Sequence, residues 1–336
     1  MQLQGGETVL KRVLITGITG QDGRFLTDEL HSSGYDVFGT SRRLYSEFSS
    51  DVKLDLIECK KIFLDLQEKE NIRAIIDEVQ PDLIFNLSGM SSVSDSFLNE
   101  NVCRRANLNY VIDLLEAISD LKLKDSLRVY QASSSEIFGI TNTSPQDEAT
   151  DFHPVSPYGK FKTEAHVICN EYRERKGFFI SCGILFNHES EKRSTKFVSR
   201  KITKAVAEIK FGISESLTLG NLNSQRDWGF AGDYVKAMKK MLEVDNPGDF
   251  VVSTGKSHSV SDFVGAAFRA ANIEGDHEKY LKSSADLIRK NDHGNLVGNS
   301  QKAHEELNWF PNLGFDEIVS RMVKEDINRI NAGNLN

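Results

Sequence analysis

The sequence predicts an α/β fold with a doubly wound parallel sheet, followed by a smaller part of mixed α/β structure. Three observations support this. Short apolar runs alternate with helix-like segments over residues 1–186, as in sheets built from βαβ units. The first of these runs leads directly into a glycine-rich turn and then a helix. After residue 186 the alternation stops and the pattern becomes irregular.

Six segments of the first half are expected to be strands, and the first of them, a short apolar β-branched run, suits a strand buried on both faces. These strands cover residues 12–16, 36–40, 62–66, 83–87, 127–132 and 178–185. Helices are expected at 24–30, 69–79 and 101–119, and from Ser156 to a Gly177 cap. The Ser156 hydroxyl is a good N-cap, and Pro157 suits the first turn. Such an order is typical of a Rossmann-type sheet.

The second half is expected to form a smaller, mixed α/β domain that binds the substrate across a cleft. Helical patterns cover residues 196–211, 234–242, 261–270, 303–307 and 315–330, with one strand at 250–252. We expect a Rossmann domain at 1–186, to which 229–258 returns. The substrate domain then comprises 187–228 and 259–336.

Composition limits the function. The chain has 336 residues, 39% of them hydrophobic and 27% charged, which is ordinary for a globular protein with a full core. A formal net charge of −8 argues against general binding to nucleic acids or membrane surfaces. We find no run of 18 apolar residues and no signal pattern at the amino terminus. The scattered cysteines, Cys59, Cys103, Cys169 and Cys182, lack metal or disulfide spacing, so we expect a reduced, cytoplasmic protein without a metal.

The glycine-rich turn predicts a dinucleotide site. Gly17, Gly20 and Gly23 are three residues apart between a predicted strand and a predicted helix. Glycines there let the backbone approach a pyrophosphate, which the amino end of the helix stabilises. A purely structural turn is the alternative. The expected cofactor contacts in the turn are Gly17, Thr19, Gly20, Gln21, Asp22 and Gly23.

The end of the second predicted strand favours NADP over NAD. Sites for NAD commonly carry an acidic residue here, which holds the ribose 2′-hydroxyl. This chain has Ser41, Arg42 and Arg43 instead, and guanidinium groups suit a 2′-phosphate. A solvated basic turn is the alternative. Asp65, at the exit of the third strand, is expected to meet an adenine edge.

A candidate catalytic pair lies on the helix that begins at Ser156. Tyr158 and Lys162 are four residues apart and therefore share a helix face. A phenol has a pKa of about 10 and is a poor base at neutral pH, but a nearby ammonium favours the phenolate. Residues 133–136 follow the fifth strand, at the sheet edge where α/β proteins bind ligands. An isolated Tyr-x-x-x-Lys pair is usually a surface feature, so the surrounding motifs carry this assignment.

Together these motifs resemble those of the extended short-chain dehydrogenase/reductase superfamily, and most closely those of the GDP-mannose 4,6-dehydratase family within it. The resemblance runs from about residue 11 to residue 330. Its carriers are the strings 17–23, 133–136, 156–158 with Lys162, 183–190, 219–222 and 226–229.

The resemblance implies an NADP-dependent lyase in nucleotide-sugar metabolism and deoxysugar biosynthesis, which converts GDP-mannose to GDP-4-keto-6-deoxymannose. Tyr158, aided by Lys162, takes the proton of the sugar 4-hydroxyl while hydride leaves C4 for NADP. Glu136 takes the C5 proton and helps to expel the 6-hydroxyl as water, and the hydride returns to C6. Ser134 occupies a third catalytic position, which is usually threonine. Glu136 discriminates between functions, because a simple reductase or epimerase needs no such acid. Without the match, a carboxylate at a helix start or in a loop is an equally good interpretation.

The resemblance also implies binding residues and partners. Further cofactor contacts are expected at Asp65, Leu66, Leu87, Ser88, Ser91, Lys162, His188 and Arg193. Substrate contacts are expected at Ser92, Asn187, Lys201, Arg226 and Arg289. Arg42 and Arg43 match an arginine pair that in the family also lies near the cofactor of a neighbouring subunit. This match implies a homodimer or homotetramer.

Several positions depart from the family pattern. Val102 replaces a tyrosine that touches the cofactor, Ser92 replaces a histidine near the substrate, residues 191–192 replace Pro-Arg, and residues 289–292 replace Arg-Pro-Thr-Glu. These departures leave the sugar open, so another GDP-hexose or a GDP-heptose is an alternative substrate.

Two other functions are alternatives. The first is a reductase or epimerase of the same superfamily that acts on a GDP-4-keto-6-deoxy sugar. The second is a non-catalytic NADP-binding subunit. Retention of Ser134, Glu136, Tyr158 and Lys162 together argues against the non-catalytic reading.

Overall fold

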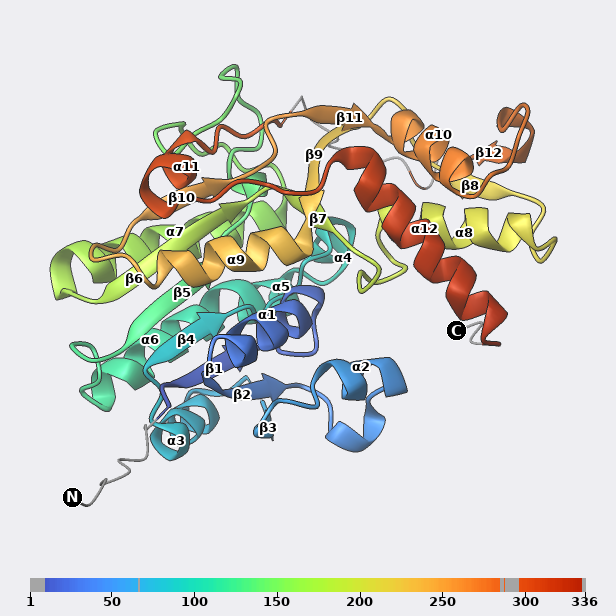
Figure 1. Ribbon diagram of the computed structural model, residues 1–336. Helices are drawn as coiled ribbons and strands as arrows, with labels where there is room; N and C mark the ends of the chain where they lie inside the picture. Colours follow the sequence, from blue (N-terminus) through green and yellow to red (C-terminus); the bar gives the residue numbers. More distant parts are fainter. Residues whose placement is uncertain (1–9, 66, 285–286, 288–295, 334–336) are drawn as a thin grey trace, which may run out of the picture.

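The computed structural model describes residues 10–65, 67–284, 287 and 296–333. Its centre is a seven-stranded sheet in the order β10-β6-β5-β4-β1-β2-β3, and every pairing in it is parallel (Figure 1). The strands are β1 Arg12–Thr16, β2 Asp36–Ser41, β3 Lys61–Leu64, β4 Leu83–Asn86, β5 Arg128–Ala132, β6 Phe179–Leu185 and β10 Asp249–Val252. The order reverses between β1 and β4, which creates a crevice at the carboxyl ends of these two strands.

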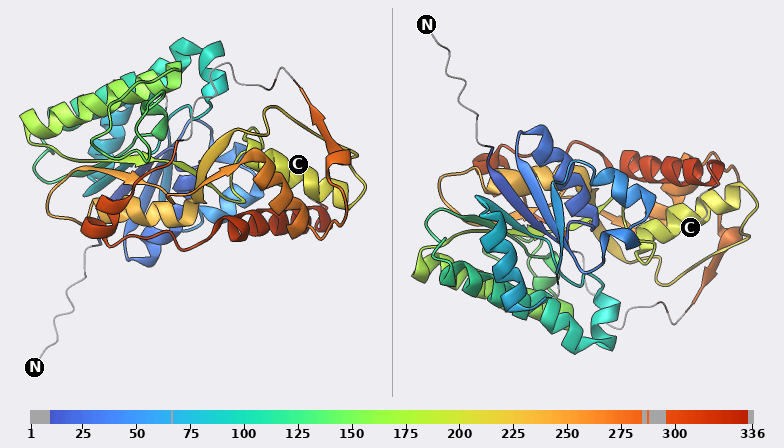
Figure 2. Two further views of the ribbon diagram at one scale, coloured as in Figure 1. Left: turned by 90° about the horizontal axis from the view of Figure 1, so that it is seen from above. Right: turned by 90° about the horizontal axis from the view of Figure 1, so that it is seen from below.

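Helices cover both faces of this sheet (Figure 2). One layer holds α1 Gln21–Ser32, α9 Ala231–Met241 and α11 Gln301–Leu307, beside the short α2 Ser50–Asp55. The other layer holds α3 Lys69–Val79, α6 Tyr110–Asp120 and α7 Pro157–Lys176. Alternate residues of β1 serve the two cores, since Val13 and Ile15 pack with the α1 layer and Leu14 packs with the α3 layer. The expected doubly wound α/β fold is confirmed.

The rest of the chain forms a smaller body at the other end of the molecule (Figure 1). A three-stranded sheet has the order β11-β9-β7, and β8 pairs with β12. Trp228, Phe263 and Met322 lie in its separate apolar core. The elements are β7 Asn187–Glu189, α8 Val198–Lys210, β8 Leu217–Leu219, β9 Gln225–Phe230, β11 Ser257–Ser259, α10 Val260–Ala270, β12 Leu281–Ser283 and α12 Phe315–Asn331.

Some elements differ from the sequence-based expectation. The helix expected at 101–119 is split into α5 Glu100–Arg104, a π-helical turn at Arg105–Asn109, and α6. The first helix begins at Gln21, three residues earlier than expected, so Gly23 lies inside its first turn. The short helix α2 and the strands of the smaller body were not predicted, nor were α4 Val93–Leu98 and the 3-10 turns at Tyr45–Glu47, Ser135–Ile137 and Glu278–Tyr280. Within the described residues, no helix is both long and apolar enough to cross a membrane.

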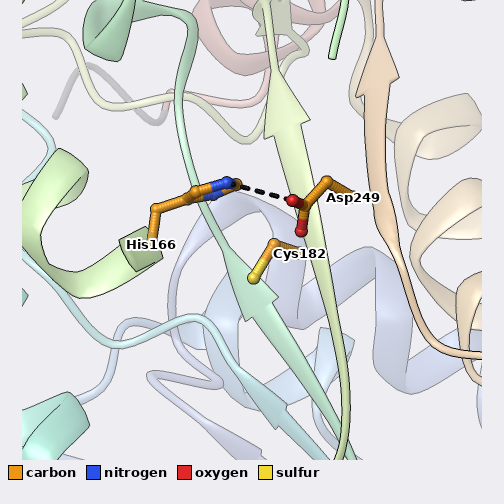
Figure 3. A group of neighbouring side chains, drawn as sticks. All are labelled: His166, Cys182 and Asp249. Atoms are coloured by element: carbon orange, nitrogen blue, oxygen red, sulfur yellow. Dashed lines mark ion pairs between the residues drawn. The ribbon is translucent and has the colours of Figure 1, made fainter. Parts of the chain in front are cut away.

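A buried ion-pair cluster fastens α7 to the edge strand β10. His166 Nε2 on α7 lies 3.3 Å from Asp249 Oδ2 on β10, beside Cys182 of β6 (Figure 3). Arg173, two turns further along α7, contacts both Asp249 oxygens at 2.9 and 3.2 Å. Because α7 also carries Tyr158 and Lys162, this cluster fixes the element that presents the candidate catalytic pair.

Candidate active site

A cavity of about 770 Å³ opens at the carboxyl edge of the large sheet. Its walls include the β1–α1 turn, the segments that follow β2, β3, β4, β5 and β6, the start of α7 and the loop after β7. This is the crevice of the strand-order reversal, where open α/β sheets bind ligands. Chain segments far apart in sequence therefore meet in one site.

The glycine turn packs closely against neighbouring backbone, which requires residues without side chains. Gly17 has φ +68°, and a Cβ there would lie 3.1 Å from the Ser88 backbone. A Cβ on Gly23 would lie 2.5 Å from the Ile18 carbonyl oxygen, so α1 can pack this closely on the turn only without a side chain. The N-cap Gly20 offers no side-chain hydrogen bond to the first turn. The first amides of α1 thus remain donors for an anion.

An ion pair closes one side of the cavity. His188 Nε2 lies 2.9 Å from Asp22 Oδ2, and its Nδ1 lies 2.8 Å from the Phe186 carbonyl oxygen. Both partners can only accept, so both ring nitrogens donate and the imidazole is cationic. Burial opposes that charge, but the charge and hydrogen bond of Asp22 outweigh it and raise the pKa of His188. Gln21 adds a second link, donating to the His188 carbonyl at 3.0 Å.

The arginine pair lies at the far end of the cavity. Arg42 and Arg43 both line it and are exposed. The Arg43 guanidinium lies 5.7 Å from the Phe48 ring centroid. Neither arginine has an ion-pair partner among the described residues. Two uncompensated cations at this point fit a phosphate group.

Asp65 lines the same region, but its carboxylate is already bonded within the protein. It accepts hydrogen bonds from the Tyr110 hydroxyl at 2.6 Å, the Thr40 hydroxyl at 3.1 Å and the Gln67 amide at 2.8 Å. Burial and the Asp65 charge raise the pKa of Tyr110 well above its ordinary value, so the phenol stays a donor. The adenine contact of Asp65 remains a prediction.

The four candidate catalytic residues share the cavity wall. Ser134 and Glu136 follow β5, and the Ser134 hydroxyl accepts from the Glu136 amide at 3.3 Å. Tyr158 and Lys162 extend from the first two turns of α7, which Ser156 caps by accepting from the Gly159 amide at 3.0 Å. The expected N-cap geometry is therefore present.

Burial dominates the electrostatics of the Tyr–Lys pair. Tyr158 is 8% exposed and Lys162 is 6% exposed. Burial raises the pKa of Tyr158 to about 12, against an opposing hydrogen bond with Ser134. Burial lowers the pKa of Lys162 to about 8. Its Nζ donates to the Ala132 carbonyl at 2.9 Å and lies 5.9 Å from the Tyr158 ring centroid. Strongly shifted groups that share a cleft are typical of reactive sites.

Most of the expected cofactor contacts meet here. Those that line the cavity are Gly17, Thr19, Gly20, Gln21, Asp22, Gly23, Arg42, Arg43, Asp65, Leu87, Ser88, Ser91, Lys162, His188 and Arg193. Leu66 falls outside the described residues.

The expected substrate contacts are less concentrated. Asn187 lines the cavity, whereas Ser92, Lys201 and Arg226 do not. The Ser92 hydroxyl caps α4 by accepting from the Asp95 amide at 3.1 Å. Arg289 falls outside the described residues.

Sequence reasoning missed several residues of the cavity wall. Asn107 enters from the π-helical turn, which no local pattern marked. Its amide nitrogen donates to the Met90 carbonyl at 3.1 Å. Lys196 and Phe197 enter from the segment between β7 and α8, where the sequence predicted the first residues of a helix that in fact begins at Val198. The Arg193 guanidinium lies 3.7 Å from the Phe197 ring centroid.

The chain is similar in sequence to known proteins over most of its length. The family model for GDP-mannose 4,6 dehydratase matches residues 14–322. GDP-mannose 4,6 dehydratase 2 of Arabidopsis thaliana is 40% identical over 328 residues, covering 94% of this chain and 87% of that protein. The Homo sapiens GDP-mannose 4,6 dehydratase is 38% identical over 340 residues, with 94% and 91% covered.

Solved structures with the same fold include more distant proteins. RMD from Pseudomonas aeruginosa complexed with NADPH has a TM-score of 0.79 at 19% identity, covering 95% of this chain and all (100%) of that one. UDP-glucose 4-epimerase of Thermotoga maritima with UDP-glucose has a TM-score of 0.82 at 20% identity, with 96% and 99% covered. At such identities the likeness shows the fold alone. The family model and the relatives near 40% identity show more: this chain belongs to the GDP-mannose 4,6-dehydratase family.

Proposed function

We propose that this protein is an NADP-dependent lyase that dehydrates GDP-mannose to GDP-4-keto-6-deoxymannose. The observation that carries the proposal is the convergence of Ser134, Glu136, Tyr158 and Lys162 on one cavity, in a chain of this family. A reductase or epimerase also needs the hydroxyl, the phenol and the amine. Only an elimination needs the additional carboxylate.

The residues of the cavity fit NADP. The glycine turn and the first amides of α1 suit a pyrophosphate, and the uncompensated Arg42 and Arg43 suit a 2′-phosphate. When bound, NADP accepts a hydride from the sugar and returns it to another carbon of the same sugar. The protein therefore has to hold the sugar in place between the two transfers.

Tyr158 acts as the base toward the sugar 4-hydroxyl. Because burial raises its pKa, a neighbouring group has to stabilise the phenolate. The Lys162 amine, with a pKa of about 8, is mostly charged at neutral pH. If the phenolate charge is placed at the ring centroid, 5.9 Å from Nζ, the attraction is on the order of 3 kcal/mol at an effective dielectric constant of about 20. That energy corresponds to about 2 pKa units, so Lys162 offsets most of the burial effect. The Ser134 hydroxyl, which forms a hydrogen bond with Tyr158, polarises the sugar 4-oxygen.

Glu136 performs the elimination. Oxidation at C4 acidifies the C5 proton, and a half-buried carboxylate at the end of β5 lies on the same wall as Tyr158. Glu136 takes the C5 proton and gives it to the departing 6-hydroxyl, which leaves as water. One carboxylate thus acts first as base and then as acid, and C5 takes a new proton derived from solvent when the hydride returns to C6.

The proposal extends to organisation and setting. We place the cofactor domain at 1–186 with 229–258, since α9 packs on α1 and β10 pairs with β6. The substrate domain then comprises 187–228 and 259–336. The two exposed arginines at the cavity support a homodimer or homotetramer, and the free cysteines suit a reducing cytoplasm.

The deciding assay incubates the protein with GDP-mannose and follows product mass without added reductant. We expect the loss of one water and no net consumption of NADPH. A product of unchanged mass indicates an epimerase, and a gain of two hydrogens with NADPH consumption indicates a reductase. Either result would overturn the proposal. Other GDP-hexoses and a GDP-heptose in the same assay identify the preferred sugar.

The cofactor assignment has its own test. Replacing Arg42 and Arg43 together with alanine should weaken NADP binding by roughly 10- to 100-fold and leave NAD binding nearly unchanged, because charged hydrogen bonds are lost only to the 2′-phosphate. Calorimetry measures both affinities. Arg175→Ala, on the exposed face of α7, is the matched control. Equal losses for NADP and NAD would contradict the assignment.

A further inference from the structure

We propose that Glu191 and Lys192 are positioning residues, two opposed ionic contacts that hold the loop of residues 190–197 over the cavity. This loop connects β7 with α8. The inference rests on the proposed function for the identity of the ligands, but not for the contacts themselves. Both residues lie at positions that depart from the family pattern.

The loop supplies part of the cavity wall. Arg193, Ser194, Lys196 and Phe197 all line the cavity. The charge of Arg193 acts on Tyr158 and on both members of the Asp22–His188 pair. The position of the loop therefore decides where a cation lies relative to the catalytic phenol and the cofactor turn.

Glu191 reaches from this loop to the C-terminal helix. Its two carboxylate oxygens accept from Arg321 Nε and Nη2 of α12 at 3.0 and 2.9 Å. The Glu191 side chain is only 11% exposed. Burial opposes its charge, but the hydrogen bonds and charge of Arg321 outweigh burial and lower the pKa of Glu191. Such a bidentate contact fixes the orientation of the Glu191 carboxylate as well as its distance from Arg321.

Lys192 reaches the opposite way, to the helices beside the large sheet. Its Nζ lies 2.8 Å from Asp55 Oδ1 of α2 and 4.4 Å from the ring centroid of Phe25 on α1. The Lys192 side chain is 12% exposed. Arg24 of α1 binds the other Asp55 oxygen, so the anchor is itself held in place.

Two adjacent residues thus tie one loop to both halves of the chain. Exposed ion pairs contribute little, but the Glu191 and Lys192 side chains are nearly buried, Asp55 is 20% exposed and only Arg321 is half exposed. The contacts are also charge-assisted. Catalytic geometry is sensitive to displacements of about 1 Å. The pair therefore fixes the position of the Arg193 guanidinium relative to Tyr158 and the β1–α1 turn.

The test uses the full-length protein with Glu191→Gln and Lys192→Met, and with Glu191→Arg combined with Arg321→Glu as charge exchange. Glu78→Gln, which breaks an exposed pair with Lys61, is the matched control. We measure amide hydrogen exchange over residues 190–197, the NADP affinity by calorimetry, and kcat and KM with GDP-mannose.

The single variants should exchange in this loop at least about tenfold faster than the parent protein. Their Kd for NADP and KM for the sugar should rise about tenfold, with kcat changed less than about threefold. The charge exchange should restore the Kd to within about threefold of the parent value. The control should match the parent protein throughout.

Two outcomes would overturn the inference. One is loop exchange and affinities equal to those of the parent protein. The other is faster exchange across the whole chain with a lower Tm and unchanged KM, which indicates a merely structural role. If the parent protein binds NADP but does not dehydrate GDP-mannose, the proposed function fails. Loop exchange and NADP affinity then still decide the role of Glu191 and Lys192.

Discussion

Lys162 is kept in the active site at a cost to folding. Its amine is nearly inaccessible and burial lowers its pKa to about 8, from an ordinary value of 10.5. Between these two values the unfolded chain binds more protons than the folded one, so stability rises with pH in that window. Below pH 8 the full penalty applies. A buried amine with this penalty is expected where function, not packing, selects the residue.

We therefore predict that Lys162→Met stabilises the protein at pH 7 by about 1–3 kcal/mol, because it removes a buried charge. The gain should shrink as pH rises from about 8 to about 10.5, where the amine is neutral in both states. Dehydration should fall by roughly 100-fold or more, because the phenolate loses its partner. Urea unfolding across pH and initial rates measure the two effects.

The exposed Lys160, half a turn earlier on α7, is the control for this prediction. Lys160→Met should change stability by less than about 0.5 kcal/mol and leave the rate unaltered. A Lys162→Met protein less stable than its parent at pH 7 would contradict the role of burial.

Glu136 separates elimination from simple redox chemistry. We predict that Glu136→Gln lowers the dehydration rate by about 100- to 10,000-fold, because an amide cannot carry the C5 proton. NADP affinity should stay within about twofold of the parent value, since the glycine turn is untouched. Incorporation of solvent deuterium at C5 of the product, followed by mass spectrometry, measures the step directly.

Glu164→Gln provides a matched carboxylate-to-amide change on α7, and the rate should be unaffected. Turnover of Glu136→Gln within about threefold of the parent protein would assign the proton transfer to another residue.

At the scale of elements, α7 is the best example of local sequence deciding structure. Its hydroxyl N-cap, its proline in the first turn and its Gly177 end were all readable, and the helix runs from Pro157 to Lys176. Its orientation was not readable. The face presented to the cavity depends on His166 and Arg173 meeting Asp249, a residue some 80 positions away.

The His166–Asp249 contact gives a pH-dependent prediction. Burial opposes a charged His166, but neighbouring Cys182 and Asp249 outweigh burial and raise the pKa of His166. The stabilisation is therefore fully present below the ordinary value of about 6.5 and is lost as pH rises through the raised value. We predict that His166→Gln lowers the free energy of unfolding by about 1–3 kcal/mol at pH 6. The deficit should shrink steadily toward pH 10.

His31→Gln is the matched control, because His31 pairs with Glu58 at 3.2 Å with both side chains about half exposed. Its effect should stay below about 1 kcal/mol at pH 6. Urea unfolding at several pH values measures both variants. A deficit for His166→Gln that is independent of pH would show that shape, and not charge, holds α7 on β10.

The elements that the sequence missed have a common physical cause. Strands such as β1 and β4 carry their own apolar signal, because both of their faces are buried. The strands β7 and β11 have three residues each and are largely polar, and their pairing with β9 joins distant parts of the chain. The π-helical turn at Arg105–Asn109 interrupts a continuous helical pattern without a proline or glycine. Local periodicity does not encode such features.

At the scale of the whole molecule, the candidate site divides in the same way. The cofactor side is built from strand-end motifs, and the described residues among them converge as expected. The substrate side depends on how the smaller body is positioned relative to the large sheet. Its expected contacts Lys201 and Arg226 lie on α8 and β9, outside the cavity wall. Sequence motifs identify residues of a site most reliably where one sheet edge brings them together.

Separate cores lead to the last prediction. The large sheet and the smaller body have different apolar clusters, with Phe25 packed against both. NADP at 100 times its Kd should stabilise the folded protein by about 2.7 kcal/mol. Because its expected contacts lie mainly in the large-sheet body, amide exchange should slow most at the β1–α1 turn and after β2 and β4.

The helices α10 and α12 should exchange as before. GDP-mannose should then protect residues of α8 that NADP alone leaves unprotected. Equal protection of both bodies by NADP alone would mean that they respond as one unit, and the proposed division at residues 187, 229 and 259 would be wrong.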